Sequence, residues 1–371
     1  MTPTISLLQQ LIAIPSISGD EAAILQFCQQ WLGEHGVSEV ITQPQFTAGV
    51  VRANSNQPAR KALILCGHID TVAAGDEAAW TDSPWQARID GGRLYGLGAS
   101  DMKAGVAAQM TAVATYAQTP RPDLDVWCVQ VAHEEVDGAG SAAFVQYFAQ
   151  QTDYDEISCL IAEPTDMGRI EIGHRGNRFV EFLFHGESGH ASQEEHYSTS
   201  ALPAVVNFLQ QLPALREQLH STYADPVLGQ PSFTPTRISP EGAFSNNQTA
   251  AASLVAVDIR TTPRLDAVFD DWMGQVATEY GATWRYAADP APSALCATDA
   301  PIVRALQSLT PDAAITVSPA ATDQAFFQSR GINTVVFGPG DFDQAHTIDE
   351  SVSMQATEQA QQIYRNLLQV Y

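Results

Sequence analysis

Histidine and carboxylate side chains follow four apolar segments of this chain, each close to the point where the segment ends. In chain order these side chains are His68 and Asp70, then Glu134 and Glu135, then Glu163, then His346. Asp101, at the start of a segment of small residues, is a further candidate. Such apolar segments are typical of buried strands in mainly parallel sheets, whose functional sites lie beyond the carboxyl ends of the strands. We therefore expect these side chains to meet at one edge of a sheet.

Two imidazoles and several carboxylates form a donor set that zinc and cobalt accept without a thiolate ligand. Five ligands are too many for one tetrahedral ion, so the donor set predicts two ions that share a carboxylate. The adjacent Glu134 and Glu135 fit this arrangement if one of them binds metal while the other stays free as a general base.

Each candidate also has a simpler explanation. Asp101 could cap a helix, a role that aspartate favours. Glu134 and Glu135 could be solvated loop acids, Glu163 could simply end a strand, and His346 could lie in a surface loop. These explanations must all hold independently, whereas one metal centre accounts for the residues together.

The elements that must position these residues alternate between helix and strand over the first 170 residues. The pattern predicts helices at 4–14, 20–35, 101–118 and 139–150, and strands at 47–53, 62–66, 124–132 and 157–162. This order predicts an α/β domain, with a mainly parallel sheet and helices on both faces.

A different order occupies residues 172–287. Strands at 179–184, 232–239, 251–260 and 282–287 alternate with helices at 199–219 and 265–280, which is the order of a ferredoxin-like α+β domain. Helices at 300–309 and 323–330 and strands at 314–317 and 333–337 then resume the first pattern. We therefore predict a discontinuous domain of residues 1–171 and 288–371, with a smaller domain inserted at 172–287.

The composition limits the class of protein. The 371 residues, 45% of them hydrophobic and 16% charged, are typical of a soluble globular protein with room for two domains. The net charge of −24, with Lys61 and Lys103 as the only lysines, disfavours nucleic acid and anionic lipid as partners. The five widely spaced cysteines predict reduced core thiols. No apolar run is long enough to span a membrane and the amino terminus lacks a basic secretory region, so we expect a cytoplasmic protein.

The segments around the candidate residues carry motifs that are specific in combination. They read Gly67-His68-Ile69-Asp70, Gly98-Ala99-Ser100-Asp101-Met102-Lys103, His133-Glu134-Glu135, Ala162-Glu163-Pro164-Thr165, Ser188-Gly189-His190-Ala191 and Ala345-His346-Thr347. Together they resemble the di-zinc aminoacylase and carboxypeptidase metallopeptidase family, which includes acetylornithine deacetylase, acetylcitrulline deacetylase and succinyl-diaminopimelate desuccinylase. The resemblance covers essentially the whole chain. It implies a di-zinc exopeptidase-like catalytic domain and a hydrolase that cleaves the amide bond of an N-acyl amino acid.

By this resemblance, two zinc ions are bound, for which cobalt or manganese could substitute. Asp101 bridges the ions, His68 and Glu163 complete one site, and Glu135 and His346 complete the other.

The same resemblance implies the remaining catalytic roles. Asp70 orients His68, and Glu134 is the general acid and base. The inserted domain resembles the family's lid and dimerisation domain, which implies a homodimer. From this domain His190 reaches the active site, often from the partner subunit.

The carboxylate of the substrate requires a cation, and Arg260 is the best candidate because guanidinium binds carboxylate through two hydrogen bonds. The alternative for Arg260 is an ion pair within the small domain. Asn246 resembles a family residue that helps to hold the substrate, and Gly338 and Gly340 could present backbone amides to the same carboxylate.

The segment Gly173-His174-Arg175-Gly176 distinguishes between acyl groups. Desuccinylases resemble Gly-Arg-Arg-Gly here, and His174 in place of a cation weakens that match because a succinyl chain carries a second carboxylate. With Arg175, the segment resembles the acetylornithine and acetylcitrulline deacetylases. We therefore expect an N-acetyl amino acid deacetylase, with a succinyl-diaminopimelate desuccinylase or a carboxypeptidase or dipeptidase as the alternative.

Other classes of protein fit less well. Gly96-Leu97-Gly98 lacks the third glycine of a dinucleotide-binding turn, and the chain has no Gly-x-Ser-x-Gly nucleophile motif. A binding protein on the same fold that has lost catalysis is the rival from another class. Such a protein would be expected to lack Glu134 or a metal ligand, and none is missing from this sequence.

Overall fold

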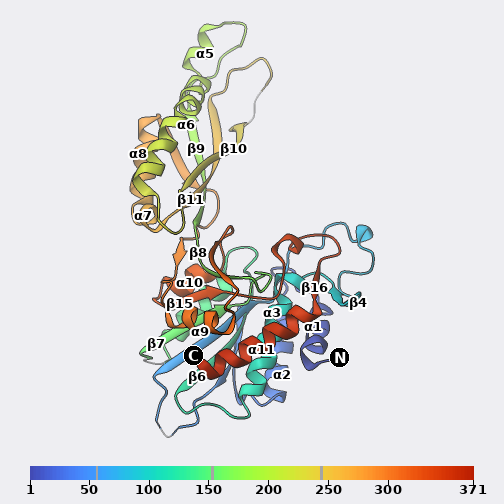
Figure 1. Ribbon diagram of the computed structural model, residues 1–371. Coiled ribbons are helices and arrows are strands. Elements are labelled where there is room, and N and C mark those ends of the chain that lie inside the picture. Colours follow the sequence, from blue (N-terminus) through green and yellow to red (C-terminus); the bar gives the residue numbers. More distant parts are fainter. Residues whose placement is uncertain (56, 152–153, 243–244) are drawn as a thin grey trace. The chain divides into compact units, whose positions relative to one another are not determined.

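The computed structural model describes residues 1–55, 57–151, 154–242 and 245–371, and the chain divides into two compact units (Figure 1). Unit 1 comprises Met1–Gly173, Cys296–Val317 and Thr322–Tyr371, and unit 2 comprises His174–Leu295 and Ser318–Ala321. The main segment of unit 2 begins close to the predicted boundary at 172 and ends beyond the predicted boundary at 287.

Parallel strands occupy the middle of the main sheet of unit 1. The strands, in order across the sheet, are β1 (Glu39–Gln43), β2 (Phe46–Val51), β6 (Leu124–Val131), β3 (Lys61–His68), β7 (Glu156–Ile161), β15 (Asn333–Val336) and β8 (Arg169–His174), and β14 (Ala314–Ser318) pairs with β8. β3 is parallel to β6 and β7, and β7 is parallel to β15. The pairs β1–β2, β2–β6 and β15–β8 are antiparallel. The prediction of a mainly parallel sheet is confirmed.

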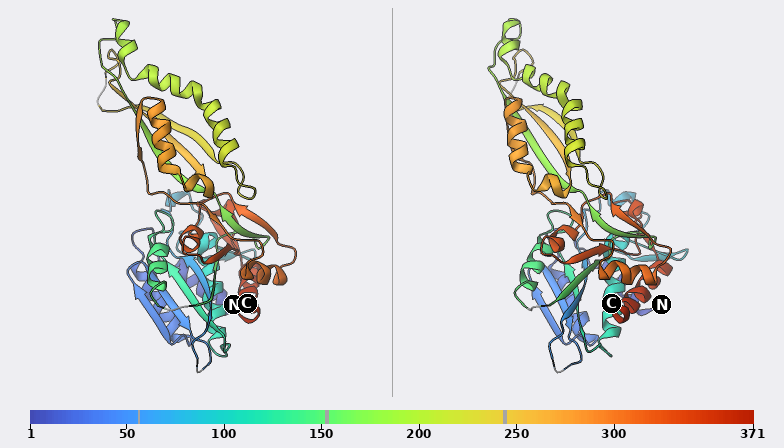
Figure 2. Two further views of the ribbon diagram at one scale, coloured as in Figure 1. Left: turned by 90° about the vertical axis from the view of Figure 1, so that its left-hand side faces the viewer. Right: turned by 60° about the vertical axis from the view of Figure 1, so that its left-hand side comes forward.

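Helices cover both faces of this sheet (Figure 2). They are α2 (Ala22–Glu34) and α3 (Ala104–Tyr116) on one face, with α1 (Pro3–Ile12), α11 (Met354–Val370) and α9 (Pro301–Leu309) packed beside them, and α4 (Ala139–Phe148) and α10 (Gln324–Gln328) on the other. On the α3 face a Cβ at Gly67 would collide with Val106, so glycine lets the helix lie close to β3. On the other face Phe144 of α4 packs edge-on against Trp127 of β6.

A small second sheet of unit 1 joins the segment after Asp90 to the carboxyl-terminal part of the chain. Its antiparallel strands, in order, are β16 (Ser351–Ser353), β5 (Arg93–Tyr95) and β4 (Arg88–Asp90). Because Ser351 pairs with Tyr95, the residue before β16 lies beside the turn that follows β5. The short helical turns η1 (Glu77–Ala79) and η3 (Phe342–Gln344) also belong to unit 1.

Unit 2 is an antiparallel sheet with two main helices. The sheet order is β10 (Ser232–Pro240), β11 (Ala252–Thr261), β9 (Gly176–His185) and β12 (Ala282–Tyr286), and the helices are α6 (Leu202–Tyr223) and α8 (Phe269–Glu279), with shorter elements α5 (Glu195–Thr199), α7 (Pro263–Asp266) and β13 (Ala294–Leu295). Phe182, Phe208 and Trp272 lie in its buried core. The chain order is the strand-helix-strand-strand-helix-strand order that the sequence predicts. The role of this unit as a lid and dimerisation domain stays a prediction.

The start of α3 differs from the sequence-based expectation. A helix was expected from Asp101, but α3 begins at Ala104, and Asp101 lies in an irregular turn, Ala99–Lys103, with φ −120° and ψ 95°. Asp101 is therefore not the cap of this helix. The pattern of the sequence does not predict α11, β8 or the small sheet.

All five cysteines are buried as free thiols, in line with the expectation of core thiols. Burial raises the pKa of the Cys128 thiol to about 12 and that of Cys296 to about 11. Because the thiolate is the reactive form, we expect the native protein to react with dithionitrobenzoate at least about tenfold more slowly than the unfolded chain. A thiol that reacts equally fast before and after unfolding would contradict this expectation.

Within the residues that the structure describes, no helix combines the length and apolar character needed to cross a membrane.

Candidate metal centre and catalytic residues

The predicted ligands of unit 1 and the predicted base, Glu134, come together although they are far apart in the sequence. They are His68 at the end of β3, Glu134 and Glu135 after β6, Glu163 after β7, His346 in the loop that follows β15, and Asp101 in the turn before α3. The ends of the strands are level because β3 and β6 are in parallel register, with His68 opposite Val131. Parallel pairing thus delivers these side chains to the same edge of the sheet.

Asp101 lies between the two histidines. Its Oδ1 atom is 3.0 Å from Nε2 of His68, and its Oδ2 atom is 3.5 Å from Nε2 of His346. One carboxylate oxygen therefore faces each imidazole, which is the arrangement that a shared ligand requires.

Each histidine also lies close to a second carboxylate. Nε2 of His68 is 3.5 Å from Oε1 of Glu163, and Nε2 of His346 is 3.0 Å from Oε1 of Glu135. Donor atoms of His68, Asp101 and Glu135 lie within 4.8 Å of one another, and so do those of His68, Glu134 and Glu163. These distances bring the candidate ligands together, and their division between two metal sites stays a prediction.

The electrostatics of the cluster favour a cation. Burial, together with the charges of neighbouring carboxylates, raises the pKa of Glu134 and of Glu163 well above the usual range. Burial opposes the charging of His68, but Glu163 and Asp101 outweigh it and raise the pKa of His68 well above its usual value. These carboxylates are crowded in a poorly solvated place, and positive charge there would stabilise their ionised forms. The oxygen and imidazole donors suit zinc-like ions, so the residues present fit a metal centre.

Asp70 has a wider role than the sequence indicates. It is fully buried, its Oδ1 accepts the backbone N–H of Glu134 at 3.1 Å, and its Oδ2 accepts that of Glu135 at 3.2 Å. The Ser18 hydroxyl donates to the same Oδ2 at 2.8 Å. Nδ1 of His68 lies 3.0 Å from the main-chain oxygen of Asp70 and 3.5 Å from its Oδ1. Asp70 is therefore placed to orient both His68 and the adjacent pair of glutamates.

The ionised form of the Asp70 carboxyl is stabilised by its hydrogen bonds. Burial opposes its ionisation, but the hydrogen bonds from His68 and Ser18 outweigh burial and lower the pKa of Asp70 to about 2. The carboxylate thus stays ionised at neutral pH and accepts these hydrogen bonds as an anion, which strengthens them.

Asp323 is a buried acid beside this cluster, and no sequence motif indicates a role for it. Its Oδ2 accepts the Ser141 hydroxyl at 2.6 Å, and burial raises the pKa of Asp323 to about 7. Since the folded protein holds a proton that the unfolded chain releases above pH 4, this group makes the protein less stable as pH rises from about 4 to about 7.

We expect Asp323→Asn to remove this dependence in the metal-free protein. Urea unfolding would measure the free energy of unfolding of both proteins. The value for the variant minus that for wild type should be about 1–3 kcal/mol higher at pH 8 than at pH 5. The serine hydroxyl keeps an acceptor in the amide oxygen of asparagine. A stability difference that does not change with pH would contradict the expectation.

The remaining predicted site residues of the inserted domain lie in unit 2, whereas the ligand cluster lies in unit 1. The Arg260 guanidinium is paired with Asp258, Nε to Oδ1 at 2.9 Å, which is the ion pair that the sequence leaves as the alternative. Asn246 is exposed, and Nδ1 of His190 lies 2.7 Å from the Ser192 hydroxyl. Their contacts with a substrate stay predictions.

His174 and Arg175 form hydrogen bonds within unit 2. His174 is buried, with Nδ1 2.9 Å from the main-chain oxygen of Arg175, and the Arg175 guanidinium donates to the main-chain oxygen of Gln230 at 2.9 Å. These bonds hold the segment in place, and its influence on the acyl group stays a prediction.

The two glycines of the loop after β15 serve close packing. The Gly338 N–H donates to the Thr165 hydroxyl at 3.1 Å, and a Cβ at Gly338 would collide with the main-chain oxygen of Ala162. A Cβ at Gly340 would collide with the main-chain oxygen of Ser100. The amide of Gly338 is therefore bonded within unit 1, and a substrate carboxylate would have to replace the Thr165 hydroxyl. The expected role of both glycines in substrate binding stays a prediction.

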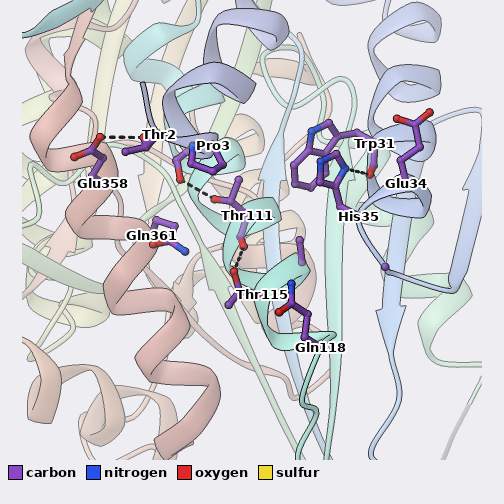
Figure 3. Close-up of a pocket in the computed structure, with 13 residues that line it drawn as sticks. Thr2, Pro3, Trp31, Glu34, His35, Thr111, Thr115, Gln118, Glu358 and Gln361 are labelled. Atoms are coloured by element: carbon purple, nitrogen blue, oxygen red, sulfur yellow. Dashed lines mark hydrogen bonds between the residues drawn. The ribbon is translucent and has the colours of Figure 1, made fainter.

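A cavity of about 680 Å³ lies elsewhere in unit 1, between α1, α2, α3 and α11 (Figure 3). Trp31, stacked on His35 with ring centroids 3.9 Å apart, forms one wall, and Thr111 and Glu358 lie on others. None of the residues that line this cavity is a predicted site residue. The candidate site is therefore assigned from the chemistry and spacing of its side chains rather than from the size of a cavity.

The sequence matches known proteins over most of its length. Residues 64–370 match the model of Peptidase family M20/M25/M40. An acetylornithine deacetylase of Proteus mirabilis (strain HI4320) is 30% identical over 380 residues, covering 98% of this chain and 96% of that protein. A succinyl-diaminopimelate desuccinylase of Variovorax paradoxus (strain S110) is 31% identical over 230 residues, covering 58% of each.

Solved structures share the fold. An M20 family metallo-carboxypeptidase from Sulfolobus solfataricus has a TM-score of 0.78 at 15% identity, covering 100% of this chain and 99% of that chain. A Bacillus subtilis protein described as a dinuclear metal-binding peptidase of the M20 family has a TM-score of 0.72 at 17% identity, covering 98% and 96%. At these identities the similarity establishes the fold alone.

Proposed function

Because the chain belongs to peptidase family M20/M25/M40 and is a hydrolase of amides, we propose that it removes the acetyl group from an N-acetyl amino acid. The observation that carries the proposal is the cluster in which Asp101 lies between His68 and His346, with Glu134 next to a ligand of that cluster. The products would be acetate and a free amino acid.

We propose that five residues hold two zinc ions. Asp101 would be shared, His68 and Glu163 would complete one site, and Glu135 and His346 the other. Bound ions of this kind supply a Lewis acid that polarises the amide carbonyl and lowers the pKa of water. Cobalt or manganese could substitute, because imidazole and carboxylate ligands accept several divalent metals.

Glu134 would act as the general base and then as the general acid. Its backbone N–H is held by Asp70, which fixes the start of the side chain, and burial raises the pKa of its carboxyl. A pKa above that of a free glutamate makes this carboxylate a stronger base toward the attacking water, and the proton that it gains is then available to the leaving amine. In the first step Glu134 would take a proton from water, and in the second it would pass the proton to the amide nitrogen as the C–N bond breaks.

The predicted site residues of unit 2 would bind the substrate at its amide carbonyl and at its carboxylate. His190 would donate to the oxyanion that develops on the amide carbonyl. Arg260 would bind the substrate carboxylate, and this requires the guanidinium to exchange Asp258 for the substrate or to bind both. Asn246 would add a polar contact.

An acetyl group is favoured over a succinyl group on two grounds. His174 replaces the cation that a second carboxylate would call for, and Arg175 is already bonded to Gln230. The acetylornithine deacetylase match extends over 98% of the chain, whereas the desuccinylase match extends over 58%. A carboxypeptidase or dipeptidase remains the second candidate, because the metallo-carboxypeptidase of Sulfolobus solfataricus has the same fold and the metal chemistry would be identical.

A substrate panel tests the assignment. Zinc-loaded protein would be assayed with N-acetylornithine, N-acetylcitrulline, N-succinyl-diaminopimelate and a set of dipeptides, and kcat/KM compared. We expect kcat/KM for at least one N-acetyl amino acid to exceed that for the succinyl and dipeptide substrates by about tenfold or more. A missing or unpaired polar contact in the poorer substrates would cost about 1–3 kcal/mol. A best substrate that is a dipeptide or carries a succinyl group would refute the acetyl assignment.

We also propose that the protein is a cytoplasmic homodimer that associates through unit 2. Sedimentation velocity would test the dimer, and a single species of about 40 kDa, the mass of one chain, at micromolar concentration would contradict it.

A further inference from the structure

Glu350 is a buried acid for which the proposed chemistry has no use. It lies directly before β16 and is 1% exposed. Its Oε2 accepts the backbone N–H of Gly98 at 2.9 Å, and its Oε1 accepts those of Ser100 at 2.7 Å and Asp101 at 3.0 Å. Its main-chain oxygen accepts the N–H of Gly96 at 2.9 Å. One residue thus binds four N–H groups of the turn at 96–101.

These N–H groups need an outside partner because the turn is not regular helix. Asp101 has extended backbone angles, and Gly98 is in the left-handed region at φ 78°. A Cβ at Gly98 would lie 2.7 Å from the Thr71 side chain, so the turn is also pressed against the segment that carries His68 and Asp70. Buried N–H groups left without an acceptor destabilise the folded state, so a side chain with two acceptor oxygens is favoured at this position. The Glu350 carboxylate meets this need at three positions.

The location of Glu350 in the chain links two predicted ligands. Glu350 is four residues after His346, and it holds the N–H of Asp101. It therefore joins the loop that carries one ligand directly to the turn that carries the shared ligand. The pairing of Ser351 with Tyr95 fixes this junction from the other side.

The two predicted metal sites depend on this junction to different extents. His68 is 1% exposed and ends a central strand, so its position is set by the sheet. The His346 side chain is half exposed, and its Nε2 atom is 3.5 Å from Oδ2 of Asp101. The site formed by His346 and Glu135 thus has fewer other constraints.

We propose that Glu350 is a positioning residue that sets the orientation of Asp101 and its spacing from His346, and thereby sets the affinity of the second metal site. The inference rests on the proposed function only in that Asp101 is taken as the shared ligand. Groups that orient metal ligands typically change metal affinity by about 10–100-fold when they are replaced.

The test is a zinc titration of metal-free protein against a competing chelator, which needs no substrate. In Glu350→Gln the side chain keeps its size, but an NH₂ group replaces one acceptor oxygen. This NH₂ group would face an N–H group of the turn. We expect the weaker zinc dissociation constant to rise about tenfold or more, and the tighter one to rise less. Glu350→Asp, which keeps the charge on a shorter side chain, should give an intermediate value.

Asp349→Asn is the matched control. The Asp349 carboxylate lies next to Glu350 in the chain but accepts the N–H and hydroxyl of Thr81, at 2.9 and 2.7 Å, away from the turn at 96–101. Its two zinc dissociation constants should stay within about twofold of wild type, because the ligands are not disturbed.

The outcomes separate positioning from general support of the fold. A folded Glu350→Gln protein with a lowered melting temperature and both dissociation constants within about twofold of wild type would overturn the proposal, and so would an equal loss of affinity in Asp349→Asn. If Glu350→Gln does not fold, Glu350→Asp decides, and zinc binding equal to wild type would overturn the proposal. The result is independent of whether the wild-type protein cleaves an N-acetyl amino acid.

Discussion

Replacing Glu134 with glutamine is expected to lower kcat by about 10²–10⁴-fold while two metal ions remain bound. Glutamine has nearly the shape of glutamate but cannot accept the proton of the attacking water or return it to the leaving amine. The backbone N–H of residue 134 would still bind Asp70, so the local structure should persist. Steady-state kinetics and metal analysis of the same preparation would measure both quantities.

Glu135→Gln is the matched control for this experiment. The two residues are adjacent and both backbone N–H groups bind Asp70, but the Glu135 side chain lies 3.0 Å from His346. We expect Glu135→Gln to lose metal, whereas Glu134→Gln keeps it. A Glu134→Gln protein that retains activity within tenfold of wild type would remove this residue from the role of base.

Removing the metal is expected to abolish turnover and to destabilise the folded protein, increasingly so as pH rises. The raised pKa values of Glu134 and Glu163 mean that the metal-free fold holds protons that the unfolded chain releases above about pH 4.5, so its stability falls as pH rises from there. The raised pKa of His68 acts in the same direction, because its contribution is lost as pH rises through the folded value.

Bound cations would reverse this trend, because they stabilise the ionised carboxylates and neutral imidazoles. We expect excess zinc to raise the free energy of unfolding by about 3 kcal/mol or more, as a ligand at 100 times its dissociation constant does. The gain should be larger at pH 8 than at pH 6. Thermal unfolding with zinc and with chelator at both pH values would measure it, and a melting temperature that does not respond to zinc would contradict a metal centre in this cluster.

The proximity of the candidate metal ligands was predictable because most of them follow recognisable strands. Apolar runs mark β3, β6 and β7, and the carboxyl ends of neighbouring parallel strands meet at one edge of a sheet. His68 and Glu163 are therefore placed together by strand pairing alone. The structure adds the distances between the candidate ligands.

The surroundings of Asp101 were not predictable in the same way. Its small-residue neighbours favour a helix, but its N–H binds Glu350, which is 249 residues away in the chain. In the structure Asp101 has extended backbone angles and precedes α3. Asp70 is a similar case, because its carboxylate accepts the backbone N–H groups of Glu134 and Glu135, which are 64 and 65 residues away in the chain.

The substrate residues were the least predictable. A guanidinium can bind a substrate or a neighbouring carboxylate, and sequence does not distinguish these for Arg260, which the structure pairs with Asp258. The Gly338 amide was an expected substrate donor, but the Thr165 hydroxyl accepts it. The role of such a polar group, in substrate binding or in an internal hydrogen bond, can be assigned only when its neighbours in the folded structure are known.

The most direct test of the central claim is a zinc titration of the metal-free protein in the presence of an N-acetyl amino acid, with acetate release and bound zinc measured together. Activity should be absent without metal and should rise until two equivalents are bound. Turnover that persists in the absence of metal, or no acetate release from any N-acetyl amino acid at full zinc loading, would contradict the assignment of this chain as a metal-dependent N-acetyl amino acid deacetylase.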